Sequence, residues 1–224
     1  MRMTKIDRRK AYYLMHDTET ANTLENPLVY DLGGAIIDKK GNVYETFSFV
    51  IYDIYALEKD LMRTAYYADK LPRYEIELAA GTRKMVTLST AKRYIADLCE
   101  RYSVKGIVAH NARFDNRALN TTQRYITKSK YRYFYPYGIP ILDTLKMAED
   151  TIGKQPTYRR WCERNGYCRQ NGRPRLTAEV LYKYISGDDD FCEAHTGIED
   201  VMIEKEIFVR CLAQHKKMRR SPWE

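Results

Sequence analysis

The chain has 224 residues and carries 38 lysines and arginines against 30 aspartates and glutamates, so its formal net charge is +8. This length suits one domain with its own core, and a 44% hydrophobic content without a long polar tract excludes wholesale disorder. No run approaches the roughly 18 apolar residues of a membrane span, and no apolar segment follows the basic N-terminus as in a signal peptide. We therefore expect a cytoplasmic protein with no membrane partner, whose positive charge favours an anionic one.

The five cysteines are odd in number and irregularly spaced, which is typical of reduced thiols. Cys162 and Cys168 stand further apart in the sequence than the usual cysteine pair of a zinc ribbon. We interpret the cysteines as buried, small hydrophobic side chains. A structural zinc site made of Cys162, Cys168 and Cys192 is the alternative.

The first 51 residues predict three consecutive strands. An apolar run over 12–15 leads into an acidic cluster, and strand-like segments follow at 28–38 and 43–51, with a turn at Gly41-Asn42 between them. Short turns between consecutive strands indicate an antiparallel meander. Residues 54–88 are rich in tyrosine and charge, and we expect them to form a helical insertion of two helices with a break.

Helices alternate with short strands in the rest of the chain. Residues 91–102 have the spacing of an amphipathic helix, which we expect to be capped near Ser89 or Thr90. Short strands are expected at 106–110 and 139–142, each followed by a helix. The last helix starts at Thr196, which forms a capping box with Glu199 three residues later.

These elements predict an α/β fold in which an antiparallel three-strand meander and parallel strands form one mixed sheet flanked by helices. No internal repeat and no linker rich in proline, glycine or serine divides residues 1–224, so we expect a single domain. Residues 213–224 form a basic C-terminal tail, which we expect to be solvated and to attract phosphates without specificity.

Acidic side chains occur near the ends of two predicted strands. Asp17 and Glu19 stand two residues apart on the first strand, so both carboxylates lie on one face, and His16 lies on the other. Asp115 follows the strand at 106–110, at the edge of the sheet where functional crevices lie in open α/β folds. Taken alone, the pair could be a solvated strand end and Asp115 an ordinary acid in a helix's first turn.

A third acidic position accompanies the last helix. His195 precedes the predicted N-cap and Asp200 is the fourth helical residue, two places that meet in front of a helix. A charged pair that bridges a helix start is the alternative. The four carboxylates together suit Mg²⁺ or Mn²⁺ rather than Zn²⁺. Two such ions act in phosphoryl transfer, and a histidine of near-neutral pKa can accept a proton from an attacking water.

In order and spacing, these segments resemble the three motifs of the DEDDh family of 3′–5′ exonucleases. The matching segments are Asp17-Thr18-Glu19, then His110-Asn111-Ala112-Arg113-Phe114-Asp115, then His195 followed five residues later by Asp200. Ile141–Leu145 also resembles the Asp-Thr-Leu stretch that lies between the second and third motifs. The resemblance covers about residues 12–212, and segments 165–167 and 172–176 resemble small phage-encoded exonucleases.

The resemblance implies a ribonuclease-H-like fold and an enzyme that releases nucleoside 5′-monophosphates from a 3′ end. It assigns two divalent ions, Mg²⁺ or Mn²⁺, to Asp17, Glu19, Asp115 and Asp200. His195 would be the general base, and Thr18, Asn111 and Phe114 would contact the substrate. The family often has Thr-Gly where this chain has Thr20-Ala21-Asn22, so the choice of substrate stays open.

We expect single-stranded nucleic acid as the partner, with DNA favoured over RNA. Between Arg124 and Tyr137, cations alternate with aromatic side chains, the combination by which proteins bind single strands. Simple packing is the alternative, since the chain holds 20 tyrosines. A hydrolase of short or cyclic oligonucleotides and a catalytically silent nucleic-acid-binding domain are the rival functions. The resemblance also suggests a homodimer and the cytoplasm of a bacterium, or of a host cell for a phage protein.

Overall fold

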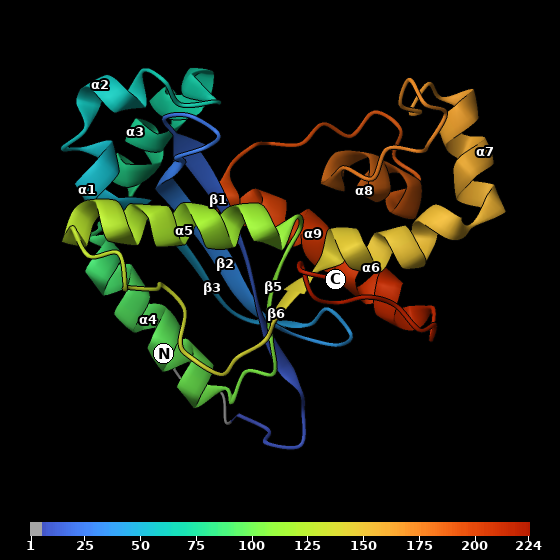
Figure 1. Ribbon diagram of the computed structural model, residues 1–224, viewed down its shortest axis with the longest axis horizontal. Helices are drawn as coiled ribbons and strands as arrows, with labels where there is room; N and C mark the ends of the chain where they lie inside the picture. Colours follow the sequence, from blue (N-terminus) through green and yellow to red (C-terminus); the bar gives the residue numbers. More distant parts are fainter. Residues whose placement is uncertain (1–5) are drawn as a thin grey trace.

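The computed structural model describes residues 6–224, which form a six-stranded mixed sheet with helices on both faces (Figure 1). The strands are β1 (Tyr12–Ala21), β2 (Leu28–Asp38), β3 (Val43–Ile51), β4 (Lys84–Val86), β5 (Ile107–Ala109) and β6 (Ile141–Asp143). Their order across the sheet is β4-β3-β2-β1-β5-β6. Strands β1, β2 and β3 pair antiparallel, whereas β5 runs parallel to β1 and β6 parallel to β5. The expected meander with added parallel strands is confirmed.

Each face of the sheet is covered by its own helices and has its own core. The helical elements are α1 (Tyr52–Tyr55), α2 (Lys59–Met62), η1 (Ala68–Lys70), α3 (Leu71–Ala80), α4 (Leu88–Arg101), α5 (Ala112–Thr127), α6 (Thr144–Asp150), η2 (Ile152–Lys154), α7 (Pro156–Arg164), α8 (Ala178–Ser186) and α9 (Gly197–Ala213). In Figure 1, α5 crosses in front of the strands, α4 lies to their lower left and α9 lies behind them. None of these helices is long and apolar enough to cross a membrane.

The alternation of side chains along β1 divides its residues between the two cores. Tyr12 and Leu14 belong to the core that contains α4 and α5, whereas Tyr13 and Met15 belong to the core that contains α9. Both faces of the strand are therefore buried. The same alternation carries Asp17 to the α9 face of the sheet.

The segment predicted as a helical insertion contains α1, α2, η1 and α3, but its end joins the sheet. Lys84–Val86 form β4, which pairs parallel with β3. The expectation of helix alone at 54–88 is wrong there, because a three-residue edge strand is too short to show an alternating pattern. The cap expected at Ser89 or Thr90 is also wrong: Thr87 is the N-cap of α4 and accepts a hydrogen bond from the Thr90 amide at 3.2 Å.

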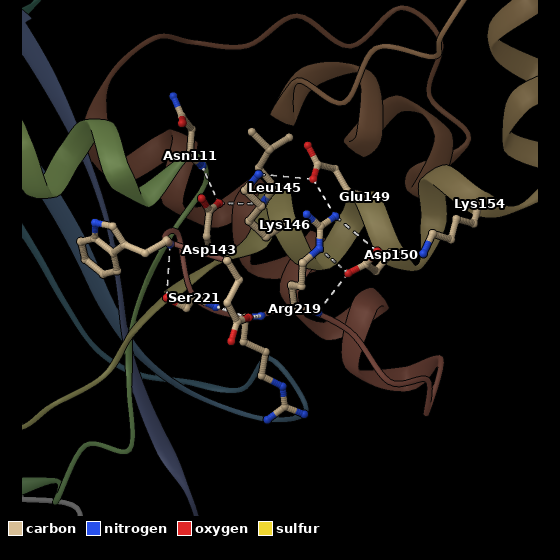
Figure 2. Close-up of polar contacts among 12 residues, drawn as sticks. Asn111, Asp143, Leu145, Lys146, Glu149, Asp150, Lys154, Arg219 and Ser221 are labelled. Carbon is tan, nitrogen blue, oxygen red and sulfur yellow. Dashed lines mark hydrogen bonds and ion pairs between the residues drawn. The ribbon is translucent and has the colours of Figure 1, made fainter.

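The basic C-terminal tail packs against α6 and β6, as Figure 2 shows. The Arg219 guanidinium donates to Asp150 at 2.8 Å and to Glu149 at 2.9 Å. The carbonyl oxygen of Arg220 accepts a hydrogen bond from the Asp143 amide at 2.7 Å, on the edge strand. The expectation of a solvated tail is therefore wrong at these two residues, because the acidic end of α6 pairs with Arg219.

Helix α9 begins directly on the backbone of β2. A Cβ atom added to Gly33 would lie 2.1 Å from the Ile198 nitrogen, and one added to Gly197 would lie 2.6 Å from the Gly33 nitrogen. No side chain fits between the helix and the strand. Gly33 pairs with Asp17 across the sheet, so this contact places the start of α9 beside the acidic end of β1.

We expect the substitution Gly33→Ala to destabilise the protein by about 3 kcal/mol, because the added methyl group must push the first turn of α9 away. Denaturant unfolding measures this loss. Hydrogen exchange at the Gly197 and Ile198 amides should also become faster.

Gly34→Ala is the matched control, because its Cβ atom would meet the Phe47 ring at 2.2 Å rather than α9. It should lower stability without faster exchange at the start of α9. Equal exchange at that turn in both variants would contradict the role given to Gly33.

Candidate active site

Three carboxylates from two elements meet at the ends of β1 and α9. Asp17 and Glu19 project from β1 on the α9 face, and Asp200 lies in the first turn of α9. One oxygen atom from each lies within 4.8 Å of the others. This is the geometry in which a divalent cation is held by oxygen ligands.

Asp115, the fourth predicted ligand, comes from the first turn of α5 and is 3% exposed. Its Oδ1 atom accepts a hydrogen bond from the Thr18 hydroxyl at 2.7 Å, so α5 is tied to β1 between the two acids of the first motif. The Thr18 hydroxyl is thus engaged within the protein. A contact between Thr18 and a nucleotide stays a prediction.

A cavity of about 590 Å³ opens over these acids. Every site residue predicted from the sequence lines it: Asp17, Thr18, Glu19, Asn111, Phe114, Asp115, His195 and Asp200. The structure therefore brings together residues that are up to 183 positions apart in the sequence, from 17 to 200. The volume is in the range of pockets that bind small molecules.

Burial raises the pKa values of the acids, and their mutual repulsion adds to the shift. Burial raises the pKa of Glu19 to about 9, with Asp200 as the strongest neighbouring charge. It raises the pKa of Asp200 to about 8, with Glu193 as the next cause, and that of Asp115 to about 7 against the hydrogen bond from Thr18. A divalent cation among these oxygens would supply the missing counter-charge.

A second, independent observation also indicates that these carboxylates could bind a cation. The Oδ1 atom of Asp200 is buried and has no hydrogen-bond partner within residues 6–224. A buried carboxylate oxygen without a partner is costly unless a cation or water satisfies it. Ligands that are all oxygen atoms suit a hard divalent cation.

His195 lies at the wall of the cavity against the predicted insertion. Its ring is stacked on the Tyr67 ring, with centroids 4.0 Å apart and planes inclined by 8°. Its Nδ1 atom lies 3.9 Å from a carboxylate oxygen of Glu193. Burial lowers the pKa of His195, and Lys70 lowers it further, so the imidazole is neutral at pH 7 and able to accept a proton.

The first turn of α9 is capped differently from the predicted capping box. Thr196 is the N-cap, but its hydroxyl donates to the Glu199 carboxylate rather than accepting from the backbone. Asp31 on β2 instead accepts a hydrogen bond from the Gly197 amide at 3.0 Å. A side chain from another part of the chain thus satisfies the helix end that carries His195 and Asp200.

Asp31 also connects this helix end to the insertion. Its carboxylate accepts hydrogen bonds from the Arg83 guanidinium at 2.7 and 2.8 Å and from the Tyr74 hydroxyl at 2.7 Å. Both Asp31 and Arg83 are almost fully buried. The insertion is therefore joined by a buried ion pair to the turn that positions the third motif.

Asp143, in the Asp-Thr-Leu stretch, fixes the start of α5 (Figure 2). Its Oδ1 atom accepts hydrogen bonds from the Asn111 amide at 3.0 Å and the Leu145 amide at 2.9 Å. Asn111 has a left-handed conformation with φ of +63°, which asparagine tolerates better than most residues. Asp143 thereby holds the turn that leads to Asp115.

Sequence reasoning missed two further acids of the cavity, Glu193 and Glu204. Glu204 is 3% exposed, and its carboxylate accepts a hydrogen bond from the His110 amide at 3.3 Å. It follows Asp200 by four residues, the helical spacing that shares one face, and this signal could have found it. His16 is buried beside Tyr135, as its place on the opposite face of β1 predicts.

No family model matches the sequence, and no curated protein matches it. One of the similar solved structures superposes well enough to show a common fold. Cell-death related nuclease 4 superposes with a TM-score of 0.53 at 11% identity, over 94% of this chain and 67% of that chain. Exonuclease X, in complex with 5′ overhanging duplex DNA, gives a TM-score of 0.44 at 14% identity, over 90% of this chain and 91% of its own.

Exonuclease I of E. coli, in complex with a dA16 oligonucleotide, gives a TM-score of 0.47 at 17% identity. The match covers 93% of this chain and 41% of that one, so the present chain spans less than half the length of exonuclease I. Identities this low establish the fold alone. The chain shares the α/β fold of cell-death related nuclease 4.

The raised pKa values predict how the stability of the metal-free protein depends on pH. Carboxylates of the unfolded chain have pKa values of about 4. In the folded state the pKa is raised to about 7 for Asp115, about 8 for Asp200 and about 9 for Glu19. The folded state therefore binds more protons between these limits, and the free energy of unfolding should fall as pH rises from about 4 to about 9. Thermal melting in EDTA across this range measures the fall.

Asp200→Asn removes one of these acids. It should raise the melting temperature of the metal-free protein at pH 8 by several degrees and flatten its pH dependence. Mn²⁺ should stabilise the wild-type protein and have little effect on the variant. Glu100→Gln, at an exposed position on α4, is the control and should behave like wild type. A wild-type melting temperature that rises from pH 5 to pH 9 in EDTA would refute the repulsion.

Proposed function

We propose that this protein is a metal-dependent 3′–5′ exonuclease that acts on single-stranded nucleic acid, with DNA preferred over RNA. The observation that carries the proposal is the convergence of Asp17, Glu19 and Asp200, with oxygen atoms within 4.8 Å of one another, in a cavity on the fold of known nucleases. Asp115 lines the same cavity and completes the four acids of the DEDDh pattern.

The four acids would hold two divalent ions, which would neutralise charge on the scissile phosphate and polarise the attacking water. His195, which lines the same cavity, would accept the proton that this water loses. The water oxygen then bonds to phosphorus, and the bond from phosphorus to the 3′ oxygen of the preceding nucleotide breaks. The departing 3′ oxygen takes a proton from solvent. The products are a nucleoside 5′-monophosphate and a strand that is shorter by one nucleotide.

The remaining residues of the cavity wall suit the terminal nucleotide. Phe114 presents an aromatic ring and Asn111 an exposed amide side chain at the start of α5. An aromatic face stacks on any base, which favours binding without a strict sequence preference. We assign these two side chains to the base and sugar of the 3′-terminal nucleotide.

Asp17→Ala should lower the rate of nucleotide release by roughly a thousandfold or more, because several kcal/mol of charge stabilisation are lost. A gel time course with 5′-labelled DNA and RNA oligomers in Mg²⁺, Mn²⁺ or EDTA measures it, with circular dichroism as the folding control. A ladder that shortens from the 3′ end in metal, and only with wild type, supports the proposal.

Intact oligomers in every lane would refute the exonuclease proposal. Cleavage confined to dinucleotides or cyclic dinucleotides would move the assignment to a hydrolase of short oligonucleotides. Binding without any cleavage would identify a catalytically silent nucleic-acid-binding domain. The faster of the two polymers decides between DNA and RNA.

Tyr67 should act as a positioning residue for His195, since the two rings are stacked. Tyr67→Phe keeps the ring and should retain nearly the wild-type turnover rate. Tyr67→Ala frees the imidazole and should lower the turnover rate by about tenfold, the effect of losing about 1.4 kcal/mol of orientation. Fixed-time assays at saturating substrate measure the turnover rate of each variant. A tenfold lower rate in Tyr67→Phe as well would contradict a role for stacking.

A further inference from the structure

A stripe of cations runs along one side of α5, away from the buried acids. Arg113, Arg117, Arg124 and Lys128 follow one another at intervals of four, seven and four residues, with Thr121 between. At 100° per residue the three arginines share one face of the helix, and Lys128 is the C-cap residue at its end. All four cations are exposed, and no carboxylate within residues 6–224 lies within ion-pair distance of them. Arg101 of α4, by contrast, is paired with Asp97.

The stripe borders a second hollow that adjoins the catalytic cavity. This hollow has a volume of about 620 Å³ and lies between α5 and the loop at 22–27, which joins β1 to β2. Arg117 lines both hollows, and its guanidinium donates a hydrogen bond to the Leu24 carbonyl at 2.8 Å, across the gap between helix and loop. The two hollows therefore meet at Arg117.

The lining of the second hollow is suited to phosphates. Arg117 and Arg124 contribute positive charge, and Asn22, Asn26 and Thr121 contribute side chains that can donate hydrogen bonds. Among the described residues that line it, Glu25 is the only acid. A polyanion would therefore find cations and hydrogen-bond donors along one wall of the hollow.

Beyond the hollow, cations lie over aromatic rings at the end of α5 and in the loop that follows it. Lys128 lies 4.3 Å from the centre of the Tyr125 ring at the end of α5. Tyr131 is 77% exposed and Tyr133 is 66% exposed, so these two rings do not pack in the core, whereas Phe134 next to them is fully buried. Exposed rings beside cations are the combination that holds single strands by stacking and charge.

We propose that the stripe on α5 binds the phosphates of the nucleotides upstream of the scissile bond, so that the protein prefers a polynucleotide to a dinucleotide. This proposal rests on the proposed function for the direction of the strand, whose 3′ end lies at the acids. From Arg117 to Lys128 the helix rises by about 16 Å, which is the span of roughly four or five phosphates of a stacked strand. Affinity should therefore grow with length and level off at about six nucleotides.

The test compares the double variant Arg124→Gln and Lys128→Asn with wild type. Glutamine keeps helix propensity, and asparagine tolerates the left-handed conformation of Lys128, φ +54°. Fluorescence anisotropy in EDTA measures the dissociation constants of 5′-labelled oligothymidylates of three nucleotides and of about 20 nucleotides. The double variant should bind the longer strand roughly tenfold more weakly. A plot of the logarithm of its binding constant against the logarithm of salt concentration should be shallower by about 1.4, since each lost phosphate contact contributes about 0.7. Binding of the trinucleotide should not change.

The double variant Lys39→Ala and Lys40→Ala is the matched control. Both lysines are exposed and directly follow β2, at the end of the strand away from the acids, and replacing them removes the same charge as the test variant. An equal loss in this control would show that net charge alone matters and would overturn the proposal. So would unchanged binding of the longer strand, or an equal loss for the trinucleotide. Because EDTA prevents metal-dependent cleavage, the binding assay tests the stripe separately from the proposed exonuclease activity. A protein that shows the expected affinities but no nuclease activity would refute the exonuclease proposal and leave the stripe proposal standing.

Discussion

The direct contact between the backbones of Gly33 and Gly197 is the constraint on which the site depends. Opposite residues of an antiparallel pair share a face of the sheet, and Asp17 is opposite Gly33 while Glu19 is opposite Asp31. One face of β1 and β2 thus carries the two acids Asp17 and Glu19. Beside them lie Gly33, on which α9 packs, and Asp31, which caps α9. Helix α9 can pack directly on the sheet only at Gly33, which has no side chain, and Gly33 lies beside Asp17.

A second consequence of this arrangement is that residues 54–88, predicted to be an insertion, contribute to the site. Asp31 would be a buried, unpaired charge without Arg83, and removing one partner of such a pair is costly. Tyr67 supplies the surface on which His195 rests, in a segment that contains no recognised motif. Residues 54–88 therefore support both the start of α9 and the orientation of the imidazole.

The motif residues could be predicted because their spacing is local: two acids on one strand, or a histidine five residues before an aspartate. The rest depends on contacts that sequence spacing does not encode. Thr196 and Glu199 have the sequence of a capping box, yet Arg73 and Arg83 compete for Glu199, and Asp31 takes the free amide. Strand β4 was missed for a different reason, since three residues are too few to show periodicity. The meander, with long alternating strands, was predicted correctly.

The acids that meet in the cavity come from the beginning, middle and end of the chain, with Asp200 in the last helix. During synthesis, the strands and α5 leave the ribosome well before α9 does, and domains fold as their residues emerge. Until α9 has docked on β2, Asp17 and Glu19 lack their third partner. The order of the elements thus fixes when the site can form: a nascent chain cannot bring Asp17, Glu19 and Asp200 together until α9, at Gly197–Ala213, has been synthesised and has docked.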